Sequence, residues 1–230
     1  MFMVQGKVND VNMGAETAAG PTRHQTRATY RHGDLHRALL EAGIDLARAG
    51  GPDAVVLREA TRRAGVSPAA AYRHFTDRHS LLHAVCASAL SALAVAIEAE
   101  MAAPPREGDL PTAARHRLRA VGTGYLRFAL AEPGLFRTAF AVPEAVRGPG
   151  SVTGPGDSGL SPFELLAAAL DDLVATGVLA PERRPGAEFL AWSAVHGLAM
   201  LALDGPLRGL ADAQTAAIGQ RLIDMVERGL

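Results

Sequence analysis

The sequence has little of several residue types, and each shortage narrows the possible folds. Of its 230 residues only one is cysteine, Cys86, and only one is lysine, Lys7. A single cysteine cannot form an internal disulfide, so nothing indicates an oxidising compartment. Cys86 lies in an apolar run, where a buried inert thiol is expected and a redox sensor is the alternative. Aromatic residues make up only 5% of the chain, which favours a helical protein over a β-rich one.

Long apolar segments are scarce as well. Residues 1–20 lack the basic start and the apolar block of a signal peptide. The longest apolar stretches, 84–97 and 189–203, are shorter than the ~20 residues that a membrane span needs. The sequence therefore predicts a cytoplasmic protein with no membrane partner.

Signatures of catalysis are missing too. The sequence has no metal-ligand spacing, no glycine-rich phosphate loop, and no partner that would make Cys86 a nucleophile. Asp171 and Asp172 are adjacent on a predicted helix, so their carboxylates point apart and do not form a catalytic pair. We predict no catalytic residue, no metal and no cofactor, and therefore a protein that is not an enzyme.

The charge that is present is unevenly distributed. The net charge of the whole chain is only −1. Residues 23–80 hold ten arginines against six acidic residues, a net charge of +4. From residue 81 onward twelve arginines face sixteen acidic residues, a net charge of −4. A basic front and an acidic body indicate that nucleic acid binds at one end only.

Hydrophobic periodicity predicts an all-α fold of about nine helices. Leu35, Leu39 and Leu46 recur at helical spacing, for example, and no stretch alternates as a strand would. The segment 142–160 is rich in glycine and proline, which predicts a long mobile loop. We expect a disordered tail at 1–29, a DNA-binding domain at 30–80 and a helical regulatory and dimerisation domain at 81–230.

Residues 57–75 have the sequence form of a helix-turn-helix. A first helix over 57–64 ends at Gly65, which tolerates the left-handed backbone that follows many helices. Ser67 then offers a hydroxyl to the free amides of the next helix. Pro68 sits at the first position of that helix, where a missing N–H costs nothing.

The second helix of this motif predicts how DNA is read. Small residues at its start, Pro68 to Ala71, let the helix enter a major groove closely. Tyr72, Arg73 and His74 then supply a hydroxyl, a guanidinium and an imidazole for phosphates and bases. For Tyr72, packing inside the small domain is the alternative.

Arg78 follows Thr76, which we expect to cap the next helix. A cation in the first turn of a helix is disfavoured by the helix dipole, so an external phosphate would explain it. A salt bridge to Asp77 or Glu59 is the alternative. We predict that DNA is bound by Arg31, Arg58, Ser67, Pro68, Ala69, Ala70, Tyr72, Arg73, His74 and Arg78.

Several short motifs occur in a fixed order in the first third of the chain: Glu41-Ala42, Gly50, Arg58-Glu59, Ala64-Gly65-Val66-Ser67, Tyr72-Arg73-His74-Phe75 and Leu81-Leu82. This set resembles the N-terminal DNA-binding domain of the TetR/AcrR family of transcriptional regulators. Near the other end, residues 191–198 resemble the Trp-x-x-x-His-Gly signature of one type of C-terminal domain in the same family.

The resemblance implies an N-terminal three-helix DNA-binding domain, followed by a helical domain that binds a ligand and dimerises. A homodimer would then bind a near-palindromic double-stranded operator as a repressor, and a small apolar effector would release it. The alternative is a helical ligand-binding or adaptor protein in which DNA binding is not the main role.

The resemblance also suggests which residues serve the second domain. For the ligand pocket we name Tyr125, Phe128, Phe136, Phe140, Trp192, His196 and Met200. A role in the core is equally open for each ring, and a hydrogen-bonded core position is open for His196. For the dimer interface, formed by the last two helices, we name Leu198, Leu203, Ile218, Leu222, Met225 and Val226.

Overall fold

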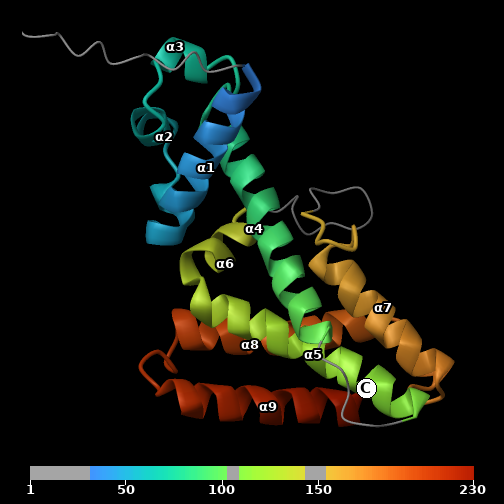
Figure 1. Cartoon of the computed structure of the whole chain (residues 1–230). Coiled ribbons are helices and arrows are strands. Elements are labelled where there is room, and N and C mark those ends of the chain that lie inside the picture. The colour runs from blue at the N-terminus through green and yellow to red at the C-terminus, as the bar shows by residue number, and fades with distance from the viewer. Residues whose placement is uncertain (1–31, 103–108, 143–153) are drawn as a thin grey trace, which may run out of the picture. The chain divides into compact units, whose positions relative to one another are not determined.

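The computed structural model describes residues 32–102, 109–142 and 154–230. Within these ranges the chain forms nine α-helices and two short 3-10 helices, and it has no strand. The predicted all-α fold is therefore confirmed (Figure 1). The predicted tail at 1–29 lies outside the described residues.

The first helices agree closely with the sequence prediction. Gly65 has a φ of +67°, so its lack of a side chain permits the turn after α2. The Ser67 hydroxyl accepts a hydrogen bond from the amide of Ala70 at 3.3 Å. These elements are α1 (His32–Gly50), η1 (Pro52–Ala54), α2 (Leu57–Arg63) and the four-residue α3 (Pro68–Ala71).

The cap of α4 (Arg78–Met101) differs from the prediction. Asp77, and not Thr76, is the capping residue, because its carboxylate accepts from the amide of Ser80 at 2.7 Å. The Ser80 hydroxyl in turn accepts from the amide of Asp77 at 3.3 Å. A charged carboxylate with a reciprocal partner completes a capping box that Thr76 cannot form at its position.

α4 is also longer than the apolar stretch on which the membrane prediction was based. By length and hydropathy it is the one described helix that could cross a membrane, and half of its most apolar window is buried inside the fold. Core helices of soluble proteins have the same properties. Here α4 packs against α1, α5, α6 and α7.

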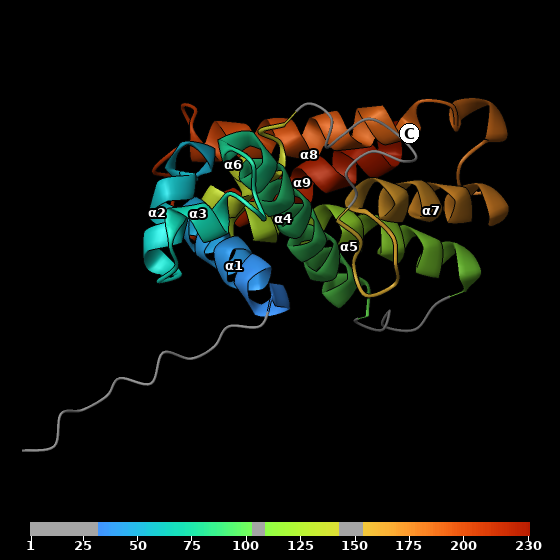
Figure 2. The ribbon, with the colours of Figure 1, turned by 90° about the horizontal axis from the view of Figure 1, so that it is seen from above.

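The remaining helices surround α4 and α5. Asp109 caps α5 by accepting from the amide of Thr112 at 3.0 Å. Ser161 and Glu164 form a capping box at the start of α7, and α8 and α9 run side by side (Figure 2). The bounds are α5 (Leu110–Ala131), α6 (Pro133–Ala139), α7 (Pro162–Ala175), η3 (Pro181–Arg183), α8 (Ala187–Leu203) and α9 (Asp212–Gly229).

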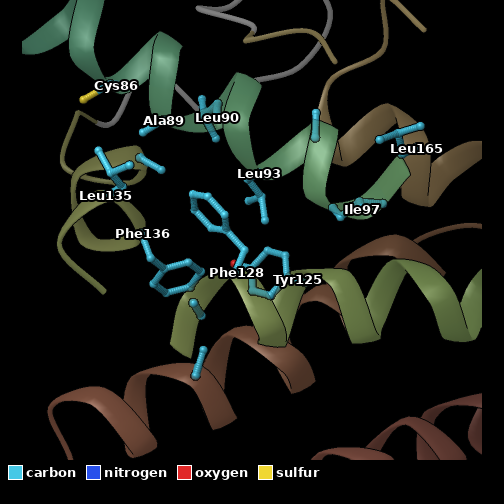
Figure 3. Close-up of a cluster of buried hydrophobic side chains, with 14 of the residues drawn as sticks. Cys86, Ala89, Leu90, Leu93, Ile97, Tyr125, Phe128, Leu135, Phe136 and Leu165 are labelled. Carbon is cyan, nitrogen blue, oxygen red and sulfur yellow. The ribbon is translucent and has the colours of Figure 1, made fainter. Parts of the chain in front are cut away.

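The core lies where α4, α5 and α6 meet (Figure 3). Leu93 and Ile97 of α4, Phe136 of α6 and Leu170 of α7 are all fully buried. Each such side chain contributes roughly 1.5–3 kcal/mol by leaving water. The thiol of Cys86 donates to the carbonyl of Thr138 at 2.9 Å, and burial raises the pKa of this thiol to about 11. The cysteine is therefore a buried and unreactive group, as expected.

Part of the predicted mobile loop at 142–160 is packed instead. Residues 143–153 lie outside the described residues, but residues 154–160 dock on α4. The Glu98 carboxylate accepts from the amides of Asp157 at 2.7 Å and Ser158 at 3.0 Å. A Cβ on Gly154 would lie 2.0 Å from the carbonyl oxygen of Ala87. The glycines that suggested mobility here allow two backbones to approach closely.

The predicted division at residue 80 falls inside α4, and residues 31–230 form one compact unit. The division into a DNA-binding and a regulatory domain stays a prediction.

Candidate DNA-binding face and regulatory interior

The helix-turn-helix exposes the side chains that the sequence assigned to DNA. Tyr72 is 57% exposed, which contradicts the alternative that it packs inside the small domain. Arg58 and Arg73 are exposed, as are Ser67, Pro68 and Ala69. Ala71 and Phe75, by contrast, are buried and hold α3 in place. Arg31 lies outside the described residues. DNA contact by these residues remains a prediction.

The arginines of this face fall into two groups. Arg62 and Arg63 donate to the carboxylate of Glu59 at 2.7–3.2 Å, and these bonds lower the pKa of Glu59 to about 2. Arg58 and Arg73 have no ion-pair partner among the described residues. Their guanidinium groups are therefore available to an external anion, while those of Arg62 and Arg63 are already engaged.

Arg78 has a different role from the one expected. Its Nε donates to the carbonyl oxygen of Val55 at 2.9 Å, and its Nη2 donates to that of Pro52 at 2.7 Å. Its ion-pair partner is Asp53, at 3.9 Å, and neither Asp77 nor Glu59. The side chain thus fastens the turn before α2 to the start of α4. The phosphate was expected because the helix dipole disfavours a cation in the first turn, and the internal partners account for this cation without a phosphate.

His36 is a residue of this face that the sequence did not indicate. It projects from α1, and its ring stacks on Phe75 with centroids 4.8 Å apart. The ring of His74 lies at its edge, at 6.1 Å. His36 is exposed, and an imidazole of α1 and an imidazole of the turn after α3 lie side by side. Only the packing of α1 on α3, which sequence spacing does not show, brings them together.

In the interior, three polar groups from two helices form a chain of hydrogen bonds. Nε1 of Trp192 donates to the hydroxyl of Tyr125 at 3.1 Å. That hydroxyl lies 2.7 Å from Nδ1 of His196. A hydroxyl that accepts from Trp192 can still donate to Nδ1 or accept from it, and the direction of this bond depends on which ring nitrogen of His196 carries the proton. We call Tyr125, Trp192 and His196 the polar trio.

The surroundings of the trio keep it uncharged. Burial raises the pKa of Tyr125 far above its usual value and lowers that of His196 below 6.5. Both shifts have the same cause, since a charge loses hydration in an apolar interior. The trio therefore offers neutral hydrogen-bonding groups to whatever approaches it.

Phenylalanine rings surround the polar trio. Phe136 meets Tyr125 edge-on at 5.4 Å, and Phe140 meets His196 at 5.0 Å and Trp192 at 6.1 Å. Phe163 of α7, which the sequence analysis missed, lies 6.1 Å from Trp192 and 5.6 Å from the exposed Phe189. A series of rings thus runs from the surface to the trio.

The other two predicted ligand residues take separate places. Phe128 is 7% exposed and belongs to the buried core (Figure 3). Met200 is 37% exposed, on an outward side of α8. Whether any of the seven contacts a ligand stays a prediction.

The predicted dimer residues divide into two groups. Ile218 and Met225 of α9 are 37% and 60% exposed, and Leu222 and Val226 are half-buried. Leu198 and Leu203, however, are buried within the chain, because they point from α8 toward its neighbours. The periodicity of α8 does not show which side faces out, because this helix is apolar all round, and dimer contact by these residues stays a prediction. The exposed apolar residues of α8 are Phe189, Leu190, Met200 and Leu201.

A small cleft of about 110 Å³ lies between α5, α8 and α9. Thr123 and Leu126 line it from α5, Leu198 and Ala202 from α8, and Gly219 from α9. None of the seven predicted ligand residues lines it.

Comparison with known proteins gives two family matches. A family described as "Bacterial regulatory proteins, tetR family" matches residues 39–85. A second, described as "Tetracyclin repressor-like, C-terminal domain", matches residues 118–226. No curated protein sequence matches the chain.

Solved structures with the same fold cover most of the chain. A protein of unknown function from Rhodococcus sp. RHA1 is 29% identical, with a TM-score of 0.68 over 88% of this chain and 98% of its own. A TetR-family transcriptional regulator from Pectobacterium atrosepticum is 23% identical, with a TM-score of 0.57 over 86% of this chain and 95% of its own. One from Thermus thermophilus is 22% identical, with a TM-score of 0.51 over 84% and 98%. The last two identities support the fold alone.

The two family matches follow each other in the order of the domains, and the solved neighbours have the same helical fold. The first match includes the helix-turn-helix with its exposed arginines, and the second includes the polar trio. The chain therefore belongs to the TetR family and is a DNA-binding transcriptional regulator.

Proposed function

We propose that two copies of this chain bind a near-palindromic operator, repress transcription, and release the DNA when a small uncharged effector enters the aromatic interior. The observation that carries this proposal is the pair of exposed arginines on a helix-turn-helix, Arg58 and Arg73, which have no partner in the part of the chain that the structure describes. No catalytic role is proposed for any residue.

The two arginines support DNA binding because an exposed guanidinium without an internal partner, on a helix-turn-helix, is available to bind phosphates and base edges. Ion pairs hold Arg62 and Arg63 to Glu59, about one turn further along α2 from Arg58. Arg58 and Arg73 lack such partners among the described residues. A phosphate backbone or a guanine edge supplies the missing anion or acceptor.

The outward face of α8 and α9 supports a homodimer. Six large apolar side chains there are 37–66% exposed, more than a soluble monomer usually leaves in one place. A Cβ added to Gly197 of α8 would meet nothing within 4 Å, so the chain's own packing does not require this glycine. A second copy related by a two-fold axis would cover both features. The six are Phe189, Leu190, Met200, Leu201, Ile218 and Met225.

The polar trio supports an effector site. Tyr125, Trp192 and His196 satisfy one another, and no charged side chain of the described residues hydrogen-bonds to them. An uncharged ring with one hydrogen-bonding group could replace the bond between Tyr125 and His196 without burying a charge. The solved TetR variant from Acinetobacter baumannii that holds minocycline has the same fold at 17% identity, with a TM-score of 0.54 over 87% of this chain and 96% of its own.

The DNA part is tested with a duplex selected by the protein from a random pool. Fluorescence anisotropy at about 50 and 200 mM salt should show affinity falling steeply as salt rises, because phosphate contacts release counterions. Arg73→Ala and Tyr72→Ala should each weaken binding about tenfold or more. Arg62→Ala is the matched control, since its guanidinium is held by Glu59.

The outcomes separate the two classes of protein. Salt-independent binding, or equal losses for Arg73→Ala and Arg62→Ala, would contradict a DNA-reading role. Either outcome would favour the alternative of a helical ligand-binding or adaptor protein. Repression is tested with the selected duplex placed upstream of a reporter gene, whose expression should fall when the protein is present.

The effector part has a built-in probe, because Trp192 is the only tryptophan. Neutral, anionic and cationic aromatic compounds should be compared by Trp192 fluorescence and by thermal shift. We expect neutral compounds to quench Trp192, to raise the melting temperature and to release the duplex. A compound that releases the duplex without affecting Trp192 would place the effector site elsewhere.

A further inference from the structure

α6 is a helix of only seven residues that contacts both the DNA-binding end and the regulatory interior. It packs on α1, α4 and α5, and it lies between the C-terminal end of α1 and α8 (Figure 1). Its own hydrogen bonds and ion pairs reach residues 52 to 84 positions away in sequence. A short element with such distant partners is well placed to connect the two ends.

On the side of α1, α6 is fixed by backbone contact and by charge. A Cβ on Gly134 would lie 2.3 Å from the carbonyl oxygen of Ala47 and 2.5 Å from that of Arg48. At the residue before α6, the Glu132 carboxylate accepts from Nε of Arg48 at 2.9 Å. The start of α6 and the end of α1 therefore move together.

On the side of α8, α6 is fixed by a two-pronged ion pair. Nε of Arg137 donates to one carboxylate oxygen of Asp204 at 2.9 Å, and Nη2 donates to the other at 2.6 Å. Nη2 also reaches the carbonyl of Leu203, the last residue of α8, at 3.4 Å. Two parallel bonds between planar groups fix an orientation as well as a distance. We call this pair the α6 latch.

Between these two ends α6 has little freedom. Phe136 is fully buried against Tyr125, Phe140 and His196. The carbonyl of Thr138 accepts from the thiol of Cys86 on α4. A tilt of α6 is therefore opposed on one flank by packing and on the other by the latch.

We infer that Arg137 is a positioning residue for DNA binding: the latch fixes α6 on α8, and α6 thereby sets the position of α1 and of the recognition elements packed on it. This inference rests on the proposed function, because operator affinity is its readout. Without the latch α6 can tilt, the spacing between the two recognition helices of the dimer varies, and a smaller fraction of molecules matches the operator.

The test measures the affinity of full-length variants for the selected duplex. Asp204→Asn removes the charge and keeps the shape, Arg137→Gln removes the charge and shortens the side chain, and each should weaken binding about tenfold. The charge-exchanged double variant Arg137→Asp with Asp204→Arg should recover most of this loss. Arg137 and Asp204 are 34% and 44% exposed, so both variants should fold.

Arg117→Gln provides the matched control. Arg117 pairs with Asp172 and joins α5 to α7 at exposures of 49% and 38%, without involving α6. Its melting temperature should fall about as much as that of Arg137→Gln, while its affinity for the duplex should stay within about twofold of wild type. If Arg137 contributed to stability alone, Arg137→Gln and Arg117→Gln would change the affinity for the duplex equally.

A second readout measures the spacing itself. The buried thiol of Cys86 resists labelling, so a nitroxide on the exposed Thr76→Cys reports the distance between the two copies. Arg137→Gln should broaden this distance distribution, and Arg117→Gln should not. Unchanged affinity and distances in Arg137→Gln would overturn the inference. If the wild-type protein selects no duplex at all, the proposed function is wrong, and the inference about Arg137, which rests on it, is wrong as well.

Discussion

The contacts within the DNA-binding end and those within the regulatory interior differ in the sequence separation of the residues they join. Around the helix-turn-helix, most polar contacts join residues three or four apart, such as Ser67 with Ala70 and Glu59 with Arg62. Arg78, with its bonds to Pro52 and Val55, is an exception. In the interior, Tyr125 meets His196 across 71 positions and Trp192 across 67. Local contacts form wherever the helix forms, while distant ones require the whole fold. Replacing a single exposed side chain of the DNA-binding end should therefore leave the fold stable, while replacing a single side chain of the regulatory interior should destabilise it.

The largest expected effect is that of Phe136→Ala. The ring is fully buried and touches Tyr125, Phe140 and His196, so its loss leaves a cavity. We expect the free energy of unfolding to fall by about 3–5 kcal/mol in a denaturant titration. Tyr72→Ala, at the exposed end, should change it by no more than about 0.5 kcal/mol. Similar losses in the two variants would remove the contrast between the regions.

Tyr125→Phe should have the next largest effect. The variant keeps the ring but leaves Nε1 of Trp192 and Nδ1 of His196 without their partner. Unsatisfied buried groups cost about 1–3 kcal/mol, which a denaturant titration measures. The control is Tyr72→Phe, because that exposed hydroxyl has water as its partner. An unchanged stability for Tyr125→Phe would mean that water takes the place of the hydroxyl.

Arg78→Ala gives a smaller effect and tests a correction to the sequence interpretation. Its guanidinium holds the carbonyls of Pro52 and Val55, but it is 47% exposed, so water replaces part of what is lost. We expect a loss of about 1 kcal/mol in the free energy of unfolding. Arg73→Ala should leave stability unchanged while weakening DNA binding. If Arg78→Ala and Arg73→Ala both lost DNA affinity without any loss of stability, Arg78 would be a direct phosphate contact after all.

Residues 57–75 show why the helix-turn-helix was predictable from sequence. Gly65, Ser67 and Pro68 act on their immediate neighbours, so their order in the chain already determines the turn and the cap. The exposure of Tyr72 and Arg73 was also predictable, because the other residues of such a short motif have to form its buried side.

The partners of Arg78, His36 and Arg137 were not predictable in the same way. Each meets groups of a segment that is distant in the sequence, and only the packing of the helices brings these segments together. The same holds for the outward face of α8. That helix is apolar all round, so the choice of Leu198 and Leu203 as interface residues had no pattern to support it.

The smallest expected effect is a dependence of stability on pH in the interior. Burial holds the pKa of His196 below its ordinary value of 6.5, so the unfolded chain binds a proton there more readily than the folded chain. The free energy of unfolding should therefore fall as the pH drops below about 6.5, until the folded imidazole is also protonated. Denaturant titrations at several values between about pH 7.5 and 5 should show this slope.

Two variants separate His196 from the other titrating groups of the chain. His196→Asn presents a side-chain amide near the position of Nδ1, so the Tyr125 hydroxyl keeps a hydrogen-bond partner that does not titrate. Its stability should fall less between about pH 7 and 5 than that of wild type. His79→Asn, at an exposed imidazole of the DNA-binding end, should follow the wild-type curve. Equal pH dependence in all three proteins would show that His196 is solvated in the folded state. The polar trio would then be as open to water as the helix-turn-helix surface, and the contrast between the two regions would not extend to their electrostatics.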